Sequence, residues 1–400
     1  MISWKNPESA RLGVRLMLVT YIGGAIGASI HAQGRHLENN FAIFREAFFN
    51  LVAGRDLYAV YPSFYFDKFK YSPSFAFLIG PIAVLPPVIG LVVWNLLNAL
   101  AVWWVLVRLF PPARAVTALV LVALELFGSM QTAQSNGLVT ALVVLAWLSL
   151  DEGRPVRGAV AIALGTAIKL FPLAGATLAL LNARRRRFFA ALAASGVAIA
   201  ALPLIVISPG ALVQQYRSWQ LVVQSDELNG VTRVNTHLIG GVMEQLHLWG
   251  GVHWPNWPVE LAGTLVLLLP LVVARARWAE RPFRLRYLAS LLIYMVIFNH
   301  QAESPSFVIA MTGIAIWYLA ADRGTVDLAL LVGALLLTSV ASSELTPHAI
   351  RIGVVRTYGL KAIPSIVIWL VLQAELLGLR RDRPRQPEAR EPAPAMARAT

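Results

Sequence analysis

Cysteine is absent from the 400 residues, and charged residues are scarce at 14% of the chain. Without cysteine the chain can form neither disulfides nor thiolate metal sites. An average soluble domain carries about 25% charged residues, so a water-soluble globule of this size would have too little polar surface. Hydrophobic residues account for 57% of the chain. The composition therefore excludes an ordinary soluble protein and favours an integral membrane protein.

Signatures for nucleotides and metals are also missing. The sequence contains no G-x-x-x-x-G-K-[ST] and no G-x-G-x-x-G that opens a helix after a strand. Its seven histidines are scattered, and no H-E-x-x-H or acidic D-x-D cluster occurs. The net charge of +13 forms no basic patch interleaved with aromatics. We therefore expect no metal, no cofactor and no nucleic-acid partner.

Long apolar runs predict an all-α integral membrane protein with about twelve transmembrane helices. Runs such as 119–124, 138–148 and 265–273 are of the kind that bilayer helices need. We expect one polytopic domain over 1–379, whose first span is a retained signal anchor, and a disordered basic tail over 380–400. The spans are expected near 10–31, 88–110, 115–131, 134–150, 157–168, 171–182, 187–207, 259–277, 284–300, 303–320, 325–343 and 357–379.

The distribution of positive charge predicts the orientation. With the N-terminus in the cytoplasm, most of the 34 Lys and Arg residues fall in cytoplasmic segments, as the positive-inside rule requires. We therefore expect a multi-pass plasma-membrane protein with both termini in the cytoplasm and two polar loops, 32–72 and 208–257, outside. The aromatic and charged mixture of the first loop predicts amphipathic helices at the interface.

Polar residues near the outer ends of the expected spans are the first functional candidates. Burying such groups in hydrocarbon is costly unless they pair or face a cavity. The short pair of spans at 157–168 and 171–182, broken at Lys169, also predicts a cavity, because irregular backbone at depth needs cover. Interhelical hydrogen bonding or a headgroup location is the alternative. The residues concerned are Glu125, Gln131, Gln134, Asn136 and Lys169.

Two further outer segments carry ionisable side chains. The turn 299–305 places His300 beside Glu303, which suits either a general base or phosphate partner, or an ordinary helix cap opened by Pro305. The other group is expected to be a solvated loop that contributes cations. It holds Glu344, His348, Arg351 and Arg356.

Several motifs follow one another in a recognisable order. Residues 40–44 precede a Gly-Arg-Asp-Leu-Tyr segment at 54–58, and Tyr71-Ser72-Pro73 leads into an apolar stretch with Pro81, Pro86, Trp94 and Asn98. Ala133-Gln134-Ser135-Asn136 is similar to a Gly-Gln-x-Asn signature. Residues 169–172 match Lys-x-x-Pro before the basic run 184–187, and His300 lies in an outer turn. This order resembles glycosyltransferase family 87 of the GT-C superfamily.

The resemblance implies a GT-C-like helical bundle with amphipathic loop helices on the outer side. It implies inverting transfer of a sugar, with mannose the family expectation, from a polyprenyl phosphate donor to a lipid or glycan acceptor. The expected partners are therefore membrane lipids, the polyprenyl-phosphate-linked sugar and a glycan or glycolipid acceptor. Two other functions stay open, a lipid or solute transporter and a non-catalytic subunit that binds lipid-linked glycan.

One position departs from the family pattern. The loop aspartate, which the resemblance implies to be the base, corresponds to Asn40, and an amide does not accept a proton usefully near neutral pH. Asp67 and Glu303 are the leading replacements, with Glu38 and Asp56 behind them, and His300 is a further proton acceptor. The predicted substrate-binding residues, several of them cations for a leaving phosphate, are Lys68, Lys70, Tyr71, Gln134, Asn136, Lys169, Arg351 and Arg356.

Overall fold

The computed structural model describes residues 7–232 and 241–380, and it contains helices but no strand in those residues. This confirms the prediction of an all-α protein. Of the predicted tail over 380–400, residues 381–400 lie outside the described residues. Proline opens many of the helices, where its missing N–H costs nothing and its fixed φ suits the first turn. Helices α3, α5, α6 and α8 all begin at a proline.

The first part of the chain forms eight α-helices and one 3₁₀ helix. They are α1 (Pro7–Arg35), α2 (Asn39–Val52), α3 (Pro73–Leu78), α4 (Gly80–Ala83), α5 (Pro87–Leu109), α6 (Pro112–Gln131), α7 (Asn136–Asp151), α8 (Pro155–Ile168) and η1 (Phe171–Leu181).

The second part contains longer connections and two π-helical segments, η5 and η6. Its elements are α9 (Arg185–Ala201), η2 (Leu202–Ile205), α10 (Pro209–Thr232), α11 (Val242–Gly250), α12 (Asn256–Val273), η3 (Arg275–Arg277), α13 (Arg281–Ile297), η4 (Ser304–Ser306), α14 (Phe307–Leu319), α15 (Thr325–Gly333), η5 (Ala334–Val340), α16 (His348–Ile350), η6 (Arg351–Arg356) and α17 (Ile363–Leu376).

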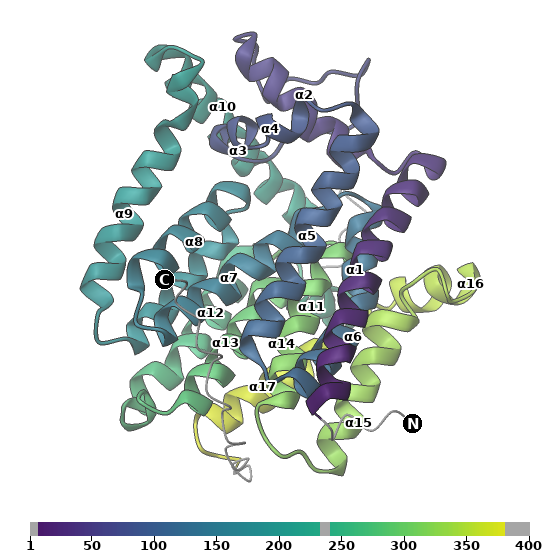
Figure 1. Cartoon of the computed structure of the whole chain (residues 1–400), viewed down its shortest axis with the longest axis vertical. Coiled ribbons are helices and arrows are strands. Elements are labelled where there is room, and N and C mark those ends of the chain that lie inside the picture. Colours follow the sequence, from purple (N-terminus) through teal and green to yellow (C-terminus); the bar gives the residue numbers. More distant parts are fainter. Residues whose placement is uncertain (1–6, 233–240, 381–400) are drawn as a thin grey trace, which may run out of the picture.

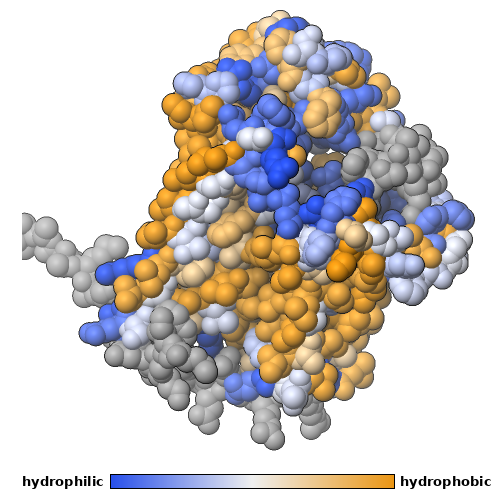
Figure 2. Space-filling model, turned by 90° about the vertical axis from the view of Figure 1, so that its right-hand side faces the viewer, coloured by the Kyte–Doolittle hydropathy of each residue, from blue (hydrophilic) through white to orange (hydrophobic). Residues whose placement is uncertain are grey.

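Within residues 7–232 and 241–380, five helices are long and apolar enough to cross a membrane. They are α1, α5, α6, the continuous stretch Arg185–Ile205 and α12, and six shorter apolar helices accompany them. Figure 2 shows an apolar surface over much of one face, with hydrophilic residues gathered around a hollow above it. The helical positions match the expected spans, whereas the number of spans and the single-domain boundary at 379 stay predictions.

The helices of the first expected outer loop and the start of the second lie at one end of the bundle. Figure 1 places α2, α3, α4 and the start of α10 at the upper end, and the first residues of α1 at the lower end. The first loop contains the helix α2, which buries Phe41, Phe44 and Leu51 on one face. The second expected loop, 208–257, contains the helix α10 (Pro209–Thr232). Long-range contacts missed by sequence reasoning hold α10 in place.

Helix α10 is held against the first loop by reciprocal hydrogen bonds. The side chain of Gln215 donates to the carbonyl of Arg55 (2.9 Å) and accepts from the N–H of Leu57 (3.1 Å). The indole of Trp219 donates to the carbonyl of Lys70 (3.0 Å). These bonds fix the backbone on both sides of the segment 56–69, which carries Asp67.

The break at Lys169 is present as expected. Helix α8 ends at Ile168, and Lys169 has extended backbone angles before the next helix begins. The second half of the pair differs from the prediction of a transmembrane α-helix, because η1 is an 11-residue 3₁₀ helix. Runs of 3₁₀ helix longer than three or four residues are uncommon and often mark functional segments. At this break the ammonium of Lys169 lies against the start of α7, where it donates to Asn136.

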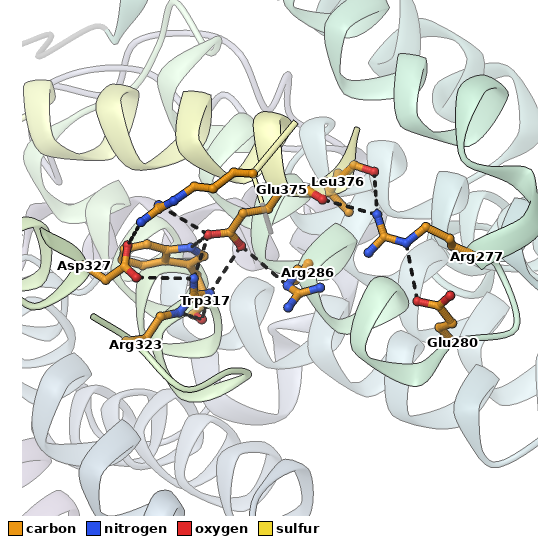
Figure 3. A network of polar contacts seen from close by, with 9 residues as sticks. Arg277, Glu280, Arg286, Trp317, Arg323, Asp327, Glu375 and Leu376 are labelled. Atoms are coloured by element: carbon orange, nitrogen blue, oxygen red, sulfur yellow. Dashed lines mark hydrogen bonds and ion pairs between the residues drawn. The ribbon is translucent and has the colours of Figure 1, made fainter. Parts of the chain in front are cut away.

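A network of buried charges joins α13, α14, α15 and α17 (Figure 3). Glu375 at the end of α17 accepts from Arg323 (2.6 Å) and from the indole of Trp317 (3.0 Å), and Arg286 lies 3.5 Å away. The side chains of Glu375 and Arg323 are only 1% and 2% exposed. Asp327 lies 3.9 Å from Arg323 and also pairs with Arg380 (2.7 Å). A buried carboxylate is tolerated when cations and hydrogen bonds surround it in this way.

The orientation can be tested with single cysteines, because the chain has none of its own. Positions 60 and 185 are exposed and lie on opposite sides of the predicted topology. We expect a membrane-impermeant thiol reagent added to intact cells to label Val60→Cys and to spare Arg185→Cys until the cells are opened. Labelling of position 185 together with protection of position 60 would show that the orientation is the reverse of the predicted one.

Candidate functional site

A cavity of about 470 Å³ gathers many of the polar residues singled out from the sequence. We call it the site cavity. Its walls come from the end of α1 and the start of α2, the loop at 66–67, the turn after α6, the turn before α14, and η6 with the residues around it. Of the predicted residues, those that line it are Asn40, Asp67, Gln134, Glu303, Arg351 and Arg356.

The turn between α6 and α7 is positioned by side chains of α5. The indole of Trp94 donates to the carbonyl of Ala133 (2.9 Å), and Asn95 donates to the carbonyl of Met130 (3.2 Å). Asn98 accepts from the N–H of Leu138 (2.8 Å). Ala133 adopts a left-handed conformation with φ of 52°, which a non-glycine residue keeps only where its surroundings hold it. These contacts present Gln134 to the site cavity.

A chain of polar contacts runs from the site cavity into the protein. Gln134 donates through its side-chain nitrogen to Glu303 (3.2 Å) and accepts through its oxygen from the ammonium of Lys169 (3.4 Å). Lys169 also donates to the side chain of Asn136 (2.8 Å). Gln134 and Glu303, which are 169 positions apart in the sequence, are thus neighbours in the structure. Lys169 and Asn136 stand behind Gln134 and do not line the site cavity themselves.

Two of the four candidate carboxylates line the site cavity. Glu303 is half-buried and lies just before η4, whereas Asp67 is 53% exposed. Asp67 has φ of 85° and accepts from the N–H of Lys68 (2.7 Å), with Lys70 at 3.9 Å. Such a backbone is costly for a non-glycine residue and is common at functional sites. Glu38 and Asp56 are not among the residues that line the site cavity.

Asn40 lies in the wall of the site cavity and serves as a hydrogen-bond donor there. Its side-chain nitrogen donates to the carbonyl of Thr132 (2.8 Å) at the end of α6. An aspartate in this place would set a carboxylate against a carbonyl, and both groups accept hydrogen bonds only. The amide therefore fits its neighbour better than the family's aspartate would.

Cations also line the site cavity. Arg351 and Arg356 belong to η6, so the prediction of a solvated loop at 344–356 is wrong for this stretch, which is helical. Sequence reasoning also missed Lys361, which lines the site cavity and binds both carboxylate oxygens of Glu125 at 3.0 Å. The sequence feature that could have identified Lys361 is its position as the one lysine inside the expected span 357–379. Glu125, singled out from the sequence, is thus neutralised by a residue 236 positions away.

Several predicted site residues lie outside the site cavity. His300 bonds through Nδ1 to Glu260 of α12 (2.7 Å) and is not among the residues that line the site cavity. Lys68 and Lys70 lie beside Asp67 without lining the site cavity. The ring of Tyr71 lies 5.9 Å from the ammonium of Lys169. Burial, with a contribution from the charge of Glu303, raises the pKa of Tyr71, so its phenol is neutral at physiological pH.

The described residues contain no group of three or more His, Asp or Glu side chains that could hold a metal ion. The arrangement instead offers hydrogen-bond donors, two carboxylates and a cationic wall. Such a cavity suits a polar ligand with an anionic group.

The model of glycosyltransferase family 87 matches residues 69–299. This stretch exceeds half of the 400 residues. The chain belongs to glycosyltransferase family 87. The resemblance read from the motifs is thereby confirmed, and the membrane-type helices agree with a membrane glycosyltransferase. A comparison with curated proteins gives no match.

The matched stretch contains only part of the site of this family member. Tyr71, Gln134, Asn136 and Lys169 fall within it, as do Trp94 and Asn98, which hold the turn at 130–138. Most of the residues that line the site cavity fall outside the match, on both sides of it. They include Asn40, Asp67, Glu303, Arg351, Arg356 and Lys361.

Proposed function

We propose that the protein transfers a sugar, with mannose the expected one, from a polyprenyl phosphate to a hydroxyl of a lipid or glycan acceptor on the outer side of the plasma membrane, inverting the anomeric centre. The observation that carries this proposal is that two carboxylates and several cations line the same cavity of about 470 Å³. A sugar phosphate needs both kinds of group.

In the proposed reaction the acceptor oxygen attacks the anomeric carbon and forms the new glycosidic bond. The bond from that carbon to the phosphate oxygen breaks, and its electron pair leaves with the polyprenyl phosphate. The acceptor proton passes to Glu303, which acts as the general base. Gln134 holds this carboxylate by the hydrogen bond described above.

The leaving group is a phosphate monoester that needs positive charge more than an acid. Arg351 and Arg356 line the site cavity and can offset the charge that develops on the phosphate. Arginine presents several donors in one plane and suits phosphate oxygens. Lys361 already pairs with Glu125, which leaves Arg351 and Arg356 as the cations proposed to meet the phosphate.

The proposal is tested with purified protein and polyprenyl phosphate sugars of different head groups. Release of polyprenyl phosphate together with a glycosylated acceptor supports the transferase. Movement of the lipid across reconstituted vesicles without bond cleavage would support the transporter instead. Binding of the donor with neither result would support a non-catalytic subunit, which the loss of the family's loop aspartate at Asn40 favours.

Asn40 gives a moderate prediction that separates a structural amide from a lost base. Asn40→Ala removes one hydrogen bond to Thr132, so we expect transfer to slow by about 3- to 10-fold, in line with about 0.5–1.5 kcal/mol for a neutral hydrogen bond. Asn40→Asp should not raise the rate, because its carboxylate would face the Thr132 carbonyl. The measurement is the initial rate of transfer at saturating donor. A clear gain in rate for Asn40→Asp would return the base to position 40.

A further inference from the structure

A second cavity, of about 530 Å³, lies far from the site cavity, and nothing in the proposed reaction uses it. We call it the basic cavity. It forms where α7 ends, where η1 passes into α9, and where α12 passes into α13. Helix α7 begins next to Gln134 and ends at Asp151 in this wall, so its 16 residues separate the two cavities by about 24 Å at 1.5 Å per residue.

The acidic residue of the basic cavity is already neutralised. Asp151 accepts from Arg284 (2.8 Å) and from Arg281 (3.0 Å), so one carboxylate faces two guanidinium groups. Arg184 and Arg185 also line the cavity. The guanidinium of Arg184 donates to the neutral carbonyl of Gly153, and neither Arg184 nor Arg185 has an ion-pair partner in the part of the chain that the structure describes. Positive charge is therefore in excess here.

The position of these arginines in α9 is electrostatically unfavourable without a ligand. Helix α9 begins at Arg185, and its first turn contains three arginines and no acidic residue. The N-terminus of a helix carries partial positive charge, so cations are disfavoured there and anions are favoured. A bound anion would offset both the helix dipole and the unpaired guanidinium groups.

The surroundings of the basic cavity suit an anion that carries acyl chains. Its wall includes Leu150, Leu180 and Leu181 beside the arginines. Helix α9 buries only Phe188, and apolar side chains just beyond the cavity face outward, with Phe189 39% and Val273 62% exposed. The wall also contains Trp278, whose buried indole nitrogen has no hydrogen-bond partner in the described residues. A soluble anion would make no contact with these apolar side chains, whereas acyl chains would cover them.

We propose that the basic cavity binds the phosphate headgroup of an anionic phospholipid from the leaflet at that end of the molecule. Basic pockets between membrane helices commonly receive such headgroups. Arg184 and Arg185 would bind the phosphate oxygens, and the acyl chains would lie along the exposed face of α9. The lipid would link α9, which has few buried residues, to the rest of the bundle.

The test compares two charge reversals that differ only in whether the residue lines the basic cavity. Arg185 lines it and Arg187 does not, and both side chains are exposed in the first turn of α9. A glutamate is favoured in either place by the helix dipole, so both variants should fold. Wild type, Arg185→Glu and Arg187→Glu are purified in detergent and titrated with phosphatidylglycerol or phosphatidylcholine, and bound lipid is measured by native mass spectrometry. Thermal unfolding in detergent micelles that contain phosphatidylcholine checks the fold of each variant.

We expect the wild type to retain phosphatidylglycerol in preference to phosphatidylcholine. Arg185→Glu should weaken that binding by about tenfold, as the loss of one charge-assisted hydrogen bond does, and Arg187→Glu should change it by less than about twofold. Equal losses in the two variants would show a diffuse basic surface and overturn the proposal. Equal retention of both lipids, or displacement of phosphatidylglycerol by millimolar inorganic phosphate, would also overturn it, the latter by identifying a soluble anion as the occupant.

Discussion

Replacing Glu303 by glutamine should slow sugar transfer by about 10²- to 10⁴-fold, the usual contribution of a general base. The substitution keeps the shape of the side chain, and its amide oxygen can still accept from Gln134. Only the capacity to take a proton is lost. The measurement is the single-turnover rate with saturating donor and acceptor, so that weakened binding does not contribute to the difference.

Asp67→Asn is the matched comparison, because it removes the other carboxylate that lines the site cavity. Asp67 is more exposed and already accepts from the N–H of Lys68. We expect a loss of no more than about tenfold, the effect of one hydrogen bond on a bound ligand. If Asp67→Asn is the slow variant and Glu303→Gln turns over normally, Asp67 is the base. Normal rates in both variants would contradict a replacement base in this cavity.

Replacing Glu375 by glutamine should destabilise the fold by about 3 kcal/mol, near the lower end for breaking a buried ion pair. The glutamine can still accept from the indole of Trp317, but the guanidinium groups of Arg323 and Arg286 lose their shared carboxylate. Asp327 stays near Arg323 and limits the loss. The measurement is thermal or denaturant unfolding of the purified protein in one detergent.

Glu280→Gln is the control for this change. Glu280 pairs with Arg277 at 3.4 Å, but its side chain is 51% exposed, and exposed pairs contribute about 0–1 kcal/mol. We expect its unfolding transition to stay close to that of the wild type. A similar loss of stability in both variants would show that burial does not decide the strength of the network in Figure 3.

Local features of the sequence were enough to predict most helices. Apolar runs, prolines at helix starts and the polar break at Lys169 all act over a few residues, and the helices follow them. Where the prediction differed, the cause was a contact between distant segments. Helix α10 was expected as a loop, and its place depends on Gln215 and Trp219, which bind backbone groups about 150 residues earlier in the chain.

The candidate site was only partly predictable for the same reason. Gln134 and Lys169 were found because polar residues at the ends of apolar spans are conspicuous. The partners of Glu125 and His300 were not found, since Lys361 and Glu260 meet them only after the helices pack. The roles of Gln134 and Lys169 in binding stay predictions.

The sequence by itself determined that this is a helical membrane protein of glycosyltransferase family 87, because composition, apolar runs and ordered motifs are properties of the chain alone. Tertiary structure decided which faces of the helices meet. In lipid a core-facing and a lipid-facing side chain are equally apolar, so periodicity does not separate them. Val197 of α9 is 71% exposed and Ile314 of α14 is fully buried, although both lie in similar apolar sequences. Packing alone therefore set Arg351, Arg356 and Glu303 around one cavity.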